Sequence, residues 1–452
     1  MPGKAEKTNA NISRKAICGA ILSLSVPAIV TNVTVPVLGI TDVAIAGHLG
    51  STVFIAAIAI GTNMFNMLYW LFNFLRMGSS GLTAQAYGAG DKVASTLVLS
   101  RALMIAVAVG VIMILFRNPL CDLILDSMDV TGDSRIVAQT YFLIRIWAAP
   151  ATLSIFAFTG WFVGMQNSKV TMWVSLLINV LNIAGSLLLV FYAGMDIDAL
   201  AHGTVMAQWG GLIAAVTVCL KKYKLSLPNV REVVNWSELK RFFSINIDIF
   251  LRTICLIAVT LWFTRIGASQ GDTMLSVNAL IMQLFTVFSF FMDGFAFAGE
   301  GLSGRFKGAC DSVGFHLTVK YLLIFGIAIS TVFTALYAFC GELFIGFLTD
   351  DIAVAYASKD YIYWAATIPF AGFLAFTWDG IFIGTTETRS MLISMALAMG
   401  VFFGVFYLSF NRLGNHGLWL AFISYLAVRG EVLWLLSRRF KNLDYFSHKE
   451  NI

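Results

Sequence analysis

The residues with the clearest chemical potential lie in the stretch 22–50, LSLSVPAIVTNVTVPVLGITDVAIAGHLG. It is almost entirely apolar and long enough to cross a bilayer, which takes roughly 20 helical residues. Yet it carries the carboxylate of Asp42 and two prolines, Pro27 and Pro36. A charge at membrane depth costs at least about 2.5–3.5 kcal/mol on insertion scales and therefore marks a candidate functional site. We expect Asp42 to bind and release a proton or cation, with Pro36 as a helix hinge. The alternative is a structural acid held by nearby hydroxyl groups.

A polar stripe in a later apolar segment could complete this site. Asn179 and Asn182 are three residues apart and so share one face of a helix, and Ser186 follows four residues later on that face. Thr204, in the next apolar segment, could join them. Amide and hydroxyl groups of this kind also hold membrane helices together, so both roles remain open at this stage.

The C-terminal half carries its own intramembrane charges. Asp248 and Arg252 are four residues apart, which suits either an internal ion pair or a place in a cavity wall. Asp293 and Asp379 each precede a glycine. We expect this group to line a cavity of the C-terminal half or to brace helix packing.

No motif for catalysis accompanies these residues. The sequence has no GxxxxGK[ST], HExxH or GxSxG motif and no clustered His/Cys set. We therefore expect no enzyme, no cofactor and no metal, and an ion gradient as the energy source. Nothing in the charge pattern calls for nucleic acid.

The elements that position these residues must be membrane helices. Hydrophobic residues make up 58% of the 452-residue chain and charged residues 12%, against about 25% charged in soluble domains. We predict an all-α integral membrane protein with twelve spans, at 19–46, 53–75, 93–116, 137–161, 170–193, 202–220, 243–266, 275–298, 317–340, 360–384, 390–410 and 415–437.

The connections between these segments alternate in charge. Basic residues gather at the N-terminus, in every second connection and in the tail, most densely after the sixth segment, whereas the other connections are acidic or neutral. The positive-inside rule then places both termini in the cytoplasm, and an even number of spans agrees with this. We expect a multi-pass protein of the plasma (inner) membrane.

The chain also contains an internal repeat. The glycine-rich motif 73–92 aligns without a gap with 293–312, and 158–169 aligns with 378–389 at the same offset of 220 residues. Six spans in each half make the repeats parallel, related by an axis along the membrane normal. We predict two six-helix lobes around a central cleft: an N-lobe at 1–220, a cytoplasmic linker at 221–241 and a C-lobe at 242–452.

The two halves differ where function is expected. At the offset of 220 residues the acids have no acidic counterpart, because Asp42 is matched by Trp262, Asp293 by Asn73, Asp379 by Thr159 and Asp248 by Ala28. The intramembrane acids therefore do not belong to the scaffold that the halves share.

Several motifs together resemble the multidrug and toxic compound extrusion (MATE) family, in its DinF branch: NVTVPVLGITDVAIAGHLG, FLRMGSSGLTAQAYGAG, INIDIFLRT, MDGFAFAGEGLSGRFKGA and WDGIFIGTTETR. The resemblance implies a V-shaped transporter of two six-helix lobes. The family's segment-one aspartate corresponds to Asp42, and its pocket positions correspond to Asn179, Asn182 and Thr204. Ser186 stands where the family leads us to expect an acid, which leaves Asp42 as the main N-lobe proton carrier.

In the C-lobe, Asp379 resembles the family's segment-ten acid, and the DinF-type pattern of segment seven falls on Asp248 and Arg252. The resemblance implies export of small amphipathic, often cationic compounds in exchange for protons, with sodium less favoured, by a monomer in the lipid bilayer. The alternatives are a flippase for lipid-linked precursors, which would need a strongly cationic cavity, and an intramembrane enzyme or passive channel.

Overall fold

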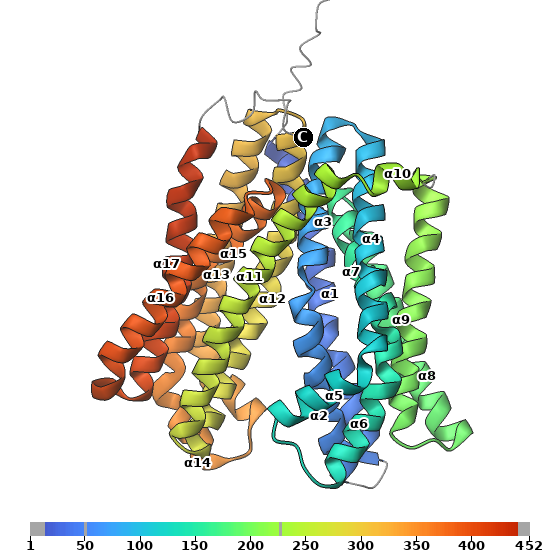
Figure 1. Cartoon of the computed structure of the whole chain (residues 1–452). Coiled ribbons are helices and arrows are strands. Elements are labelled where there is room, and N and C mark those ends of the chain that lie inside the picture. Colours follow the sequence, from blue (N-terminus) through green and yellow to red (C-terminus); the bar gives the residue numbers. More distant parts are fainter. Residues whose placement is uncertain (1–13, 49–51, 226–227, 442–452) are drawn as a thin grey trace, which may run out of the picture.

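The protein is a two-lobe bundle of helices. The computed structural model describes residues 14–48, 52–225 and 228–441, and no strand occurs among them. Twelve helical stretches in this described part are long and apolar enough to cross a membrane, which confirms the predicted all-α architecture. The N-terminal lobe, blue to green in Figure 1, lies beside the C-terminal lobe, yellow to red, and the lobes diverge toward one end.

The helices of the first lobe are α1 (Arg14–His48), α2 (Thr52–Leu71), α3 (Phe74–Ala89), α4 (Lys92–Leu115), α5 (Arg117–Ser127), α6 (Asp133–Arg145), η1 (Ile146–Ala148), α7 (Ala149–Gly164), α8 (Ser168–Ala193), α9 (Asp198–Val218) and η2 (Cys219–Tyr223). The short helix α10 (Val230–Val233) connects the lobes. The second lobe has α11 (Trp236–Ser269), α12 (Asp272–Gly308), α13 (Ser312–Leu348), α14 (Ile352–Ser358), η3 (Lys359–Tyr361), α15 (Ile362–Gly384), α16 (Thr388–Leu413), α17 (Asn415–Leu436) and η4 (Ser437–Lys441).

The glycine-rich motifs continue as helix beyond the predicted segment ends at 75 and 298, as far as Ala89 and Gly308. In the first lobe the motif forms α3, after a break at Phe72 and Asn73, and in the second it is the last part of the unbroken α12. Their small and polar residues lower the local hydropathy, but most of them are buried between helices. The first residues of α11, 236–241, are likewise helical, although the sequence predicted them as linker.

These motifs join the lobes by close backbone contact. A Cβ atom at Gly88 would lie 1.9 Å from the carbonyl oxygen of Arg305, and a Cβ atom at Gly308 would lie 2.0 Å from that of Gln85. Both pairs exchange residues at the repeat offset, so the contact has an approximate two-fold axis. Only glycine permits this approach of α3 to α12.

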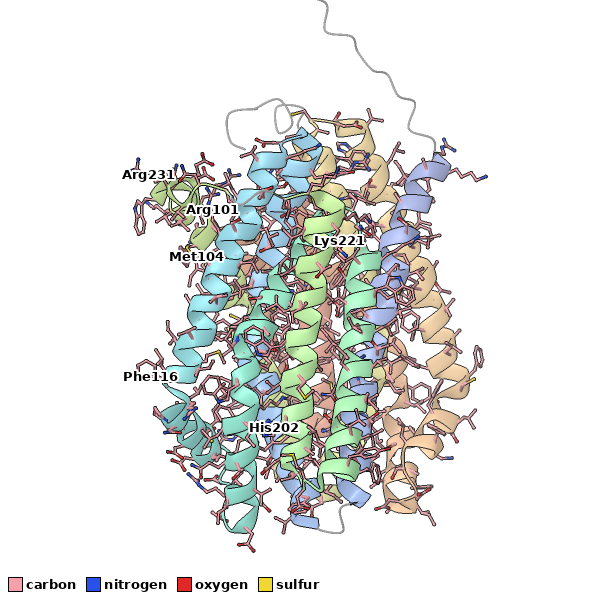
Figure 2. The ribbon with its side chains drawn as sticks, turned by 90° about the vertical axis from the view of Figure 1, so that its right-hand side faces the viewer. Arg101, Met104, Phe116, His202, Lys221 and Arg231 are labelled. Atoms are coloured by element: carbon pink, nitrogen blue, oxygen red, sulfur yellow. The ribbon has the colours of Figure 1, made fainter. Side chains whose placement is uncertain are left out.

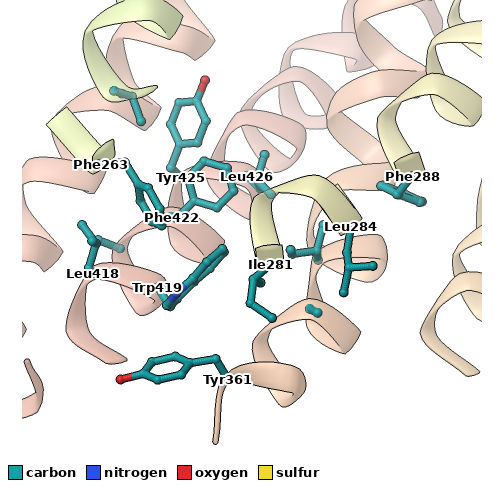
Figure 3. Packing of buried hydrophobic residues seen from close by; sticks show 14 of the residues in the cluster. Phe263, Ile281, Leu284, Phe288, Tyr361, Leu418, Trp419, Phe422, Tyr425 and Leu426 are labelled. Atoms are coloured by element: carbon teal, nitrogen blue, oxygen red, sulfur yellow. The ribbon is translucent and has the colours of Figure 1, made fainter. Parts of the chain in front are cut away.

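The interior of the second lobe is filled by aromatic side chains (Figure 3). The ring of Phe263 lies 4.9 Å from that of Trp419 and 5.3 Å from that of Phe422, centroid to centroid. The Trp419 indole donates a hydrogen bond of 2.9 Å to Asn278, so its polar atom is satisfied. The large cavity of the protein is therefore lined mainly by helices of the first lobe.

The two ends of the bundle differ in charge. The described chain begins at Arg14 and ends at Lys441 on the end where the lobes meet, at the top of Figure 1, which we call the terminal end. Figure 2 shows Arg101, Lys221 and Arg231 toward this end and His202 toward the opposite one.

The connecting segment is fastened to the first lobe. The Arg101 guanidinium, on α4, donates to the backbone oxygens of Glu232 at 3.0 Å and Val233 at 3.2 Å. These bonds hold α10 against α4.

Candidate functional site: a charged cavity in the first lobe

A cavity of about 1100 Å³ lies in the first lobe and extends to the second. Its wall comes mainly from α1, α2, α7 and α8, and α11 and α12 close the far side. Among the described residues, the charged side chains in the wall are those of Asp42, Arg76, Arg145 and Asp293. Two acids and two arginines thus face a space large enough for a drug-sized molecule.

Asp42 enters this wall from α1. Its side chain is 5% exposed, and its Oδ1 atom has no hydrogen-bond partner. Arg145, at the end of α6, is the group whose opposite charge acts on it. An unsatisfied carboxylate oxygen at a cavity wall is a place where a proton can be added.

The predicted polar stripe of α8 divides into two parts. Asn179 lines the cavity and donates a 3.3 Å hydrogen bond to the backbone oxygen of Thr34 on α1. Asn182 lies behind the wall and donates to the Thr204 hydroxyl at 2.8 Å, and Thr204 in turn donates to the Leu200 carbonyl oxygen. The first asparagine thus ties α8 to α1, and the second ties α8 to α9.

Ser186 continues this stripe away from the cavity. It is fully buried, its hydroxyl has no hydrogen-bond partner, and a Cβ atom at Gly203 would meet its Oγ at 2.4 Å. It therefore lies in the α8–α9 contact. Pro36, by contrast, lines the cavity, and α1 remains one helix through both of its prolines.

A buried ion pair closes the cavity toward the terminal end. Arg76 on α3 and Glu300 on α12 lie 3.1 Å apart and are 8% and 1% exposed. The Ser80 hydroxyl donates a 2.5 Å hydrogen bond to the same carboxylate. Arg76 lies in the first turn of α3, after the break at Phe72 and Asn73, whereas Glu300 lies inside the unbroken α12. The pair joins the two lobes deeper in the bundle than the glycine contact, because Arg76 lies at the beginning of α3 and Gly88 at its end.

The four C-lobe residues predicted for a cavity have different positions. Asp293 lines the cavity described here, where the charges of Arg76 and Arg429 act on it. The described wall does not include Asp248, Arg252 or Asp379, because these side chains are enclosed by packing among α11, α15, α16 and α17.

Asp248 and Arg252 do not pair with each other. Asp248 accepts a 3.1 Å hydrogen bond from the Thr388 hydroxyl and lies 3.6 Å from the Arg389 guanidinium. Arg252 pairs instead with Asp379, which also binds Arg429 of α17. One carboxylate therefore joins three helices of the second lobe.

Arg145 and Arg429 are the functional candidates that sequence reasoning missed. Each is an arginine within an apolar segment, which is itself a signal of an internal partner. The acids whose charges act on them, Asp42 and Asp379, are distant in sequence, and Arg429 is matched by Trp209 at the repeat offset. Neither spacing nor the repeat could therefore indicate the pairing.

Two lobes of six spans each, around a cavity lined by buried charges, define a multi-pass membrane transporter. The MatE family profile matches residues 27–188 and 245–408, once in each half, in agreement with the internal repeat. The DNA damage-inducible protein F of Escherichia coli K12 is 33% identical over 95% of this chain and 94% of its own length. The chain belongs to the MatE family, whose members are transporters and not enzymes.

More distant relatives agree with this assignment. The multidrug export protein MepA of Staphylococcus aureus MRSA252 is 22% identical over 84% of each chain. A MATE crystal structure in the bent conformation superposes with a TM-score of 0.86 at 18% identity, covering 96% of this chain and 98% of the other. An outward-facing multidrug resistance MATE transporter also reaches 0.86 at 17% identity, covering 94% and 96%. These structures establish the two-lobe fold.

Proposed function

We propose that this protein is a secondary active exporter of small amphipathic, often cationic compounds, which it exchanges for protons. Sodium is the less favoured coupling ion. The observation that carries the proposal is the Asp42 carboxylate, with an unsatisfied oxygen in the wall of a cavity of about 1100 Å³. The name of the S. aureus relative, a multidrug export protein, is consistent with this substrate class.

The coupling cycle begins with proton uptake by Asp42. Protonation removes a buried charge and releases the electrostatic hold of Arg145, which lets α1 bend at Pro36. Because Asn179 ties α8 to α1, the bend in α1 also moves α8. The cavity wall formed by these two helices is rearranged, and the substrate leaves. Asn182, Ser186 and Thr204 form the supporting layer, and Asp248, Arg252 and Asp379 brace the second lobe.

The charge distribution supports an orientation with both termini in the cytoplasm of a plasma (inner) membrane. Arg101, Lys221 and Arg231 lie at the terminal end, as the positive-inside rule requires. The Arg76–Glu300 pair then closes the cytoplasmic side, and the cavity faces outward. We propose a monomer with an N-lobe of 1–220, a linker of 221–241 and a C-lobe of 242–452.

A flippase for lipid-linked precursors would need a strongly cationic cavity. The described wall instead balances Arg76 and Arg145 against Asp42 and Asp293. This balance favours the exporter.

The test is transport by purified protein in liposomes with either a proton or a sodium gradient imposed alone. We expect ethidium to move only with the proton gradient, and Asp42→Asn to lower the rate by about tenfold or more. Asp126→Asn, an exposed acid outside the cavity, is the control and should transport normally. Full activity of the Asp42 variant would overturn the coupling site, and sodium-driven transport would overturn the choice of ion.

A further inference from the structure

Arg145 is held rigidly in the cavity wall. Its Nη1 atom donates a 2.8 Å hydrogen bond to the Tyr141 hydroxyl, and its guanidinium carbon lies 4.8 Å from the centre of the Phe65 ring. Phe65 stacks on Phe142 at 4.9 Å, and all three rings are fully buried. The positive charge therefore has a fixed position, supported by aromatic faces and one hydroxyl.

Few titratable groups surround Asp42. Arg145 and Tyr141 of α6 interact with it, Tyr69 of α2 interacts with Arg145, and Asp293 of α12 lines the same cavity. The α8 face contributes the uncharged Asn179. The fourth charge in the described wall, that of Arg76, is neutralised by Glu300. Arg145 is thus the positive charge of this wall that depends on Asp42 for its compensation.

We propose that Arg145 converts the protonation of Asp42 into repulsion of a cationic substrate. This inference rests on the proposed function and assigns it a further specificity-determining residue. While Asp42 is ionised, its charge offsets that of Arg145 and a cation can occupy the cavity. Once Asp42 binds a proton, the Arg145 charge is uncompensated and faces the substrate in a poorly solvated space, where like charges repel strongly.

The same arrangement explains the choice of coupling ion. A sodium ion bound at Asp42 would lie near the fixed guanidinium, with one carboxylate and no second acid from the α8 stripe, where Ser186 stands. A proton removes the carboxylate charge without adding a cation beside Arg145. The site therefore selects protons by charge rather than by size.

The experiment is a double-mutant cycle on the full-length protein in lipid nanodiscs, with tetraphenylphosphonium as a cation that cannot titrate. Asp42→Asn mimics the protonated acid. In the wild-type background it should weaken binding of the probe by about tenfold, whereas in an Arg145→Gln background it should weaken binding by less than about twofold. Arg145→Lys keeps the charge and should restore the tenfold effect.

A control arginine separates this role from general packing. Arg117 lies 5.6 Å over the Trp147 ring, outside the large cavity, and Arg117→Gln should leave the Asp42→Asn effect unchanged. An equal loss of affinity in the Arg145→Gln and wild-type backgrounds would overturn the proposal. If Arg145→Gln does not fold, the Arg145→Lys background provides the test. In that background Asp42→Asn should still weaken probe binding by about tenfold, and loss of this effect would overturn the proposal. Proton-driven ethidium transport by the wild type tests the proposed function separately.

Discussion

Asp42 and Asp379 occupy equally buried positions in the two lobes, each 5% exposed, but they differ in how their charges are compensated. Asp379 binds the guanidinium groups of both Arg252 and Arg429, so its negative charge is neutralised inside the second lobe. Asp42 has an unsatisfied oxygen and faces a cavity. The difference shows how one duplicated scaffold can use a buried acid as a brace in one lobe and as a proton-binding group in the other.

The position matching Asp42 in the second lobe reinforces the contrast. Trp262 stands there, and its ring packs against Phe403 at 5.5 Å and Phe406 at 6.1 Å. The second lobe thus has aromatic packing where the first has a cavity and an acid. We infer that the first lobe rearranges during transport while the second serves as the rigid partner, and the following variants test this difference.

The largest loss of stability should follow Asp379→Asn. It leaves two buried arginines without their shared carboxylate, and breaking a buried pair typically costs about 3–5 kcal/mol. The unfolding midpoint of the purified protein in detergent should fall markedly. An unfolding midpoint like that of the wild type would contradict the view that Asp379 stabilises the second lobe whereas Asp42 binds a proton.

Glu300→Gln should have the next largest effect, because it leaves the guanidinium of Arg76 buried without a counter-charge between the lobes. We expect a loss of about 3 kcal/mol. The same unfolding assay measures it. Lys359→Met is the control, since its 2.7 Å pair with Glu342 is half exposed to solvent and its removal should change the midpoint little. Equal effects of the two variants would show that the interlobe pair contributes no more than a surface pair.

Gly88→Ala and Gly308→Ala should each destabilise the lobe contact by about 1–3 kcal/mol, since overpacking forces the backbones of α3 and α12 apart. Because the two glycines are repeat counterparts with matching contacts, their effects should be similar. Gly400→Ala, on a helix with nothing within 4 Å of the added atom, is the control and should be neutral. A large difference between the first two would contradict the two-fold symmetry of the contact.

Asp42→Asn should change stability least, by no more than about 1 kcal/mol. Its Oδ1 atom makes no hydrogen bond that the amide would lose, and Arg145 lines an open cavity and keeps its contacts with Tyr141 and Phe65. The same variant should lower the rate of proton-driven transport by about tenfold or more. Comparing its midpoint with that of Asp379→Asn gives the sharpest contrast between the lobes. A midpoint that fell as far as that of Asp379→Asn would make Asp42 a structural acid.

Sequence reasoning was most informative where the signal is local. Long apolar runs predict membrane spans, and a constant offset between similar motifs predicts the repeat. Helix ends were predicted poorly in the motifs 73–92 and 293–312, because their small residues are selected for close helix contact rather than for hydropathy.

The charged partners could not be predicted for a different reason. Asp379 and Arg429 are brought together by the packing of α15 against α17. Asp42 and Arg145 share one cavity wall because α2 packs against both α1 and α6. The spacing of Asp248 and Arg252 suggested a pair that the structure divides between two networks. The partners of these charged residues are therefore set by tertiary contacts between helices and not by their spacing in the sequence.

The hydrogen bond between Ser80 and Glu300 also shows where the symmetry between the two lobes is broken. The two residues are separated by the repeat offset of 220 and meet at the approximate two-fold axis, so each faces its own counterpart. A glutamate at both positions would place two buried like charges against each other across this axis, which would oppose the contact of the lobes. The difference between Ser80 and Glu300 instead lets one carboxylate be shared by a hydroxyl and by Arg76 of the other lobe.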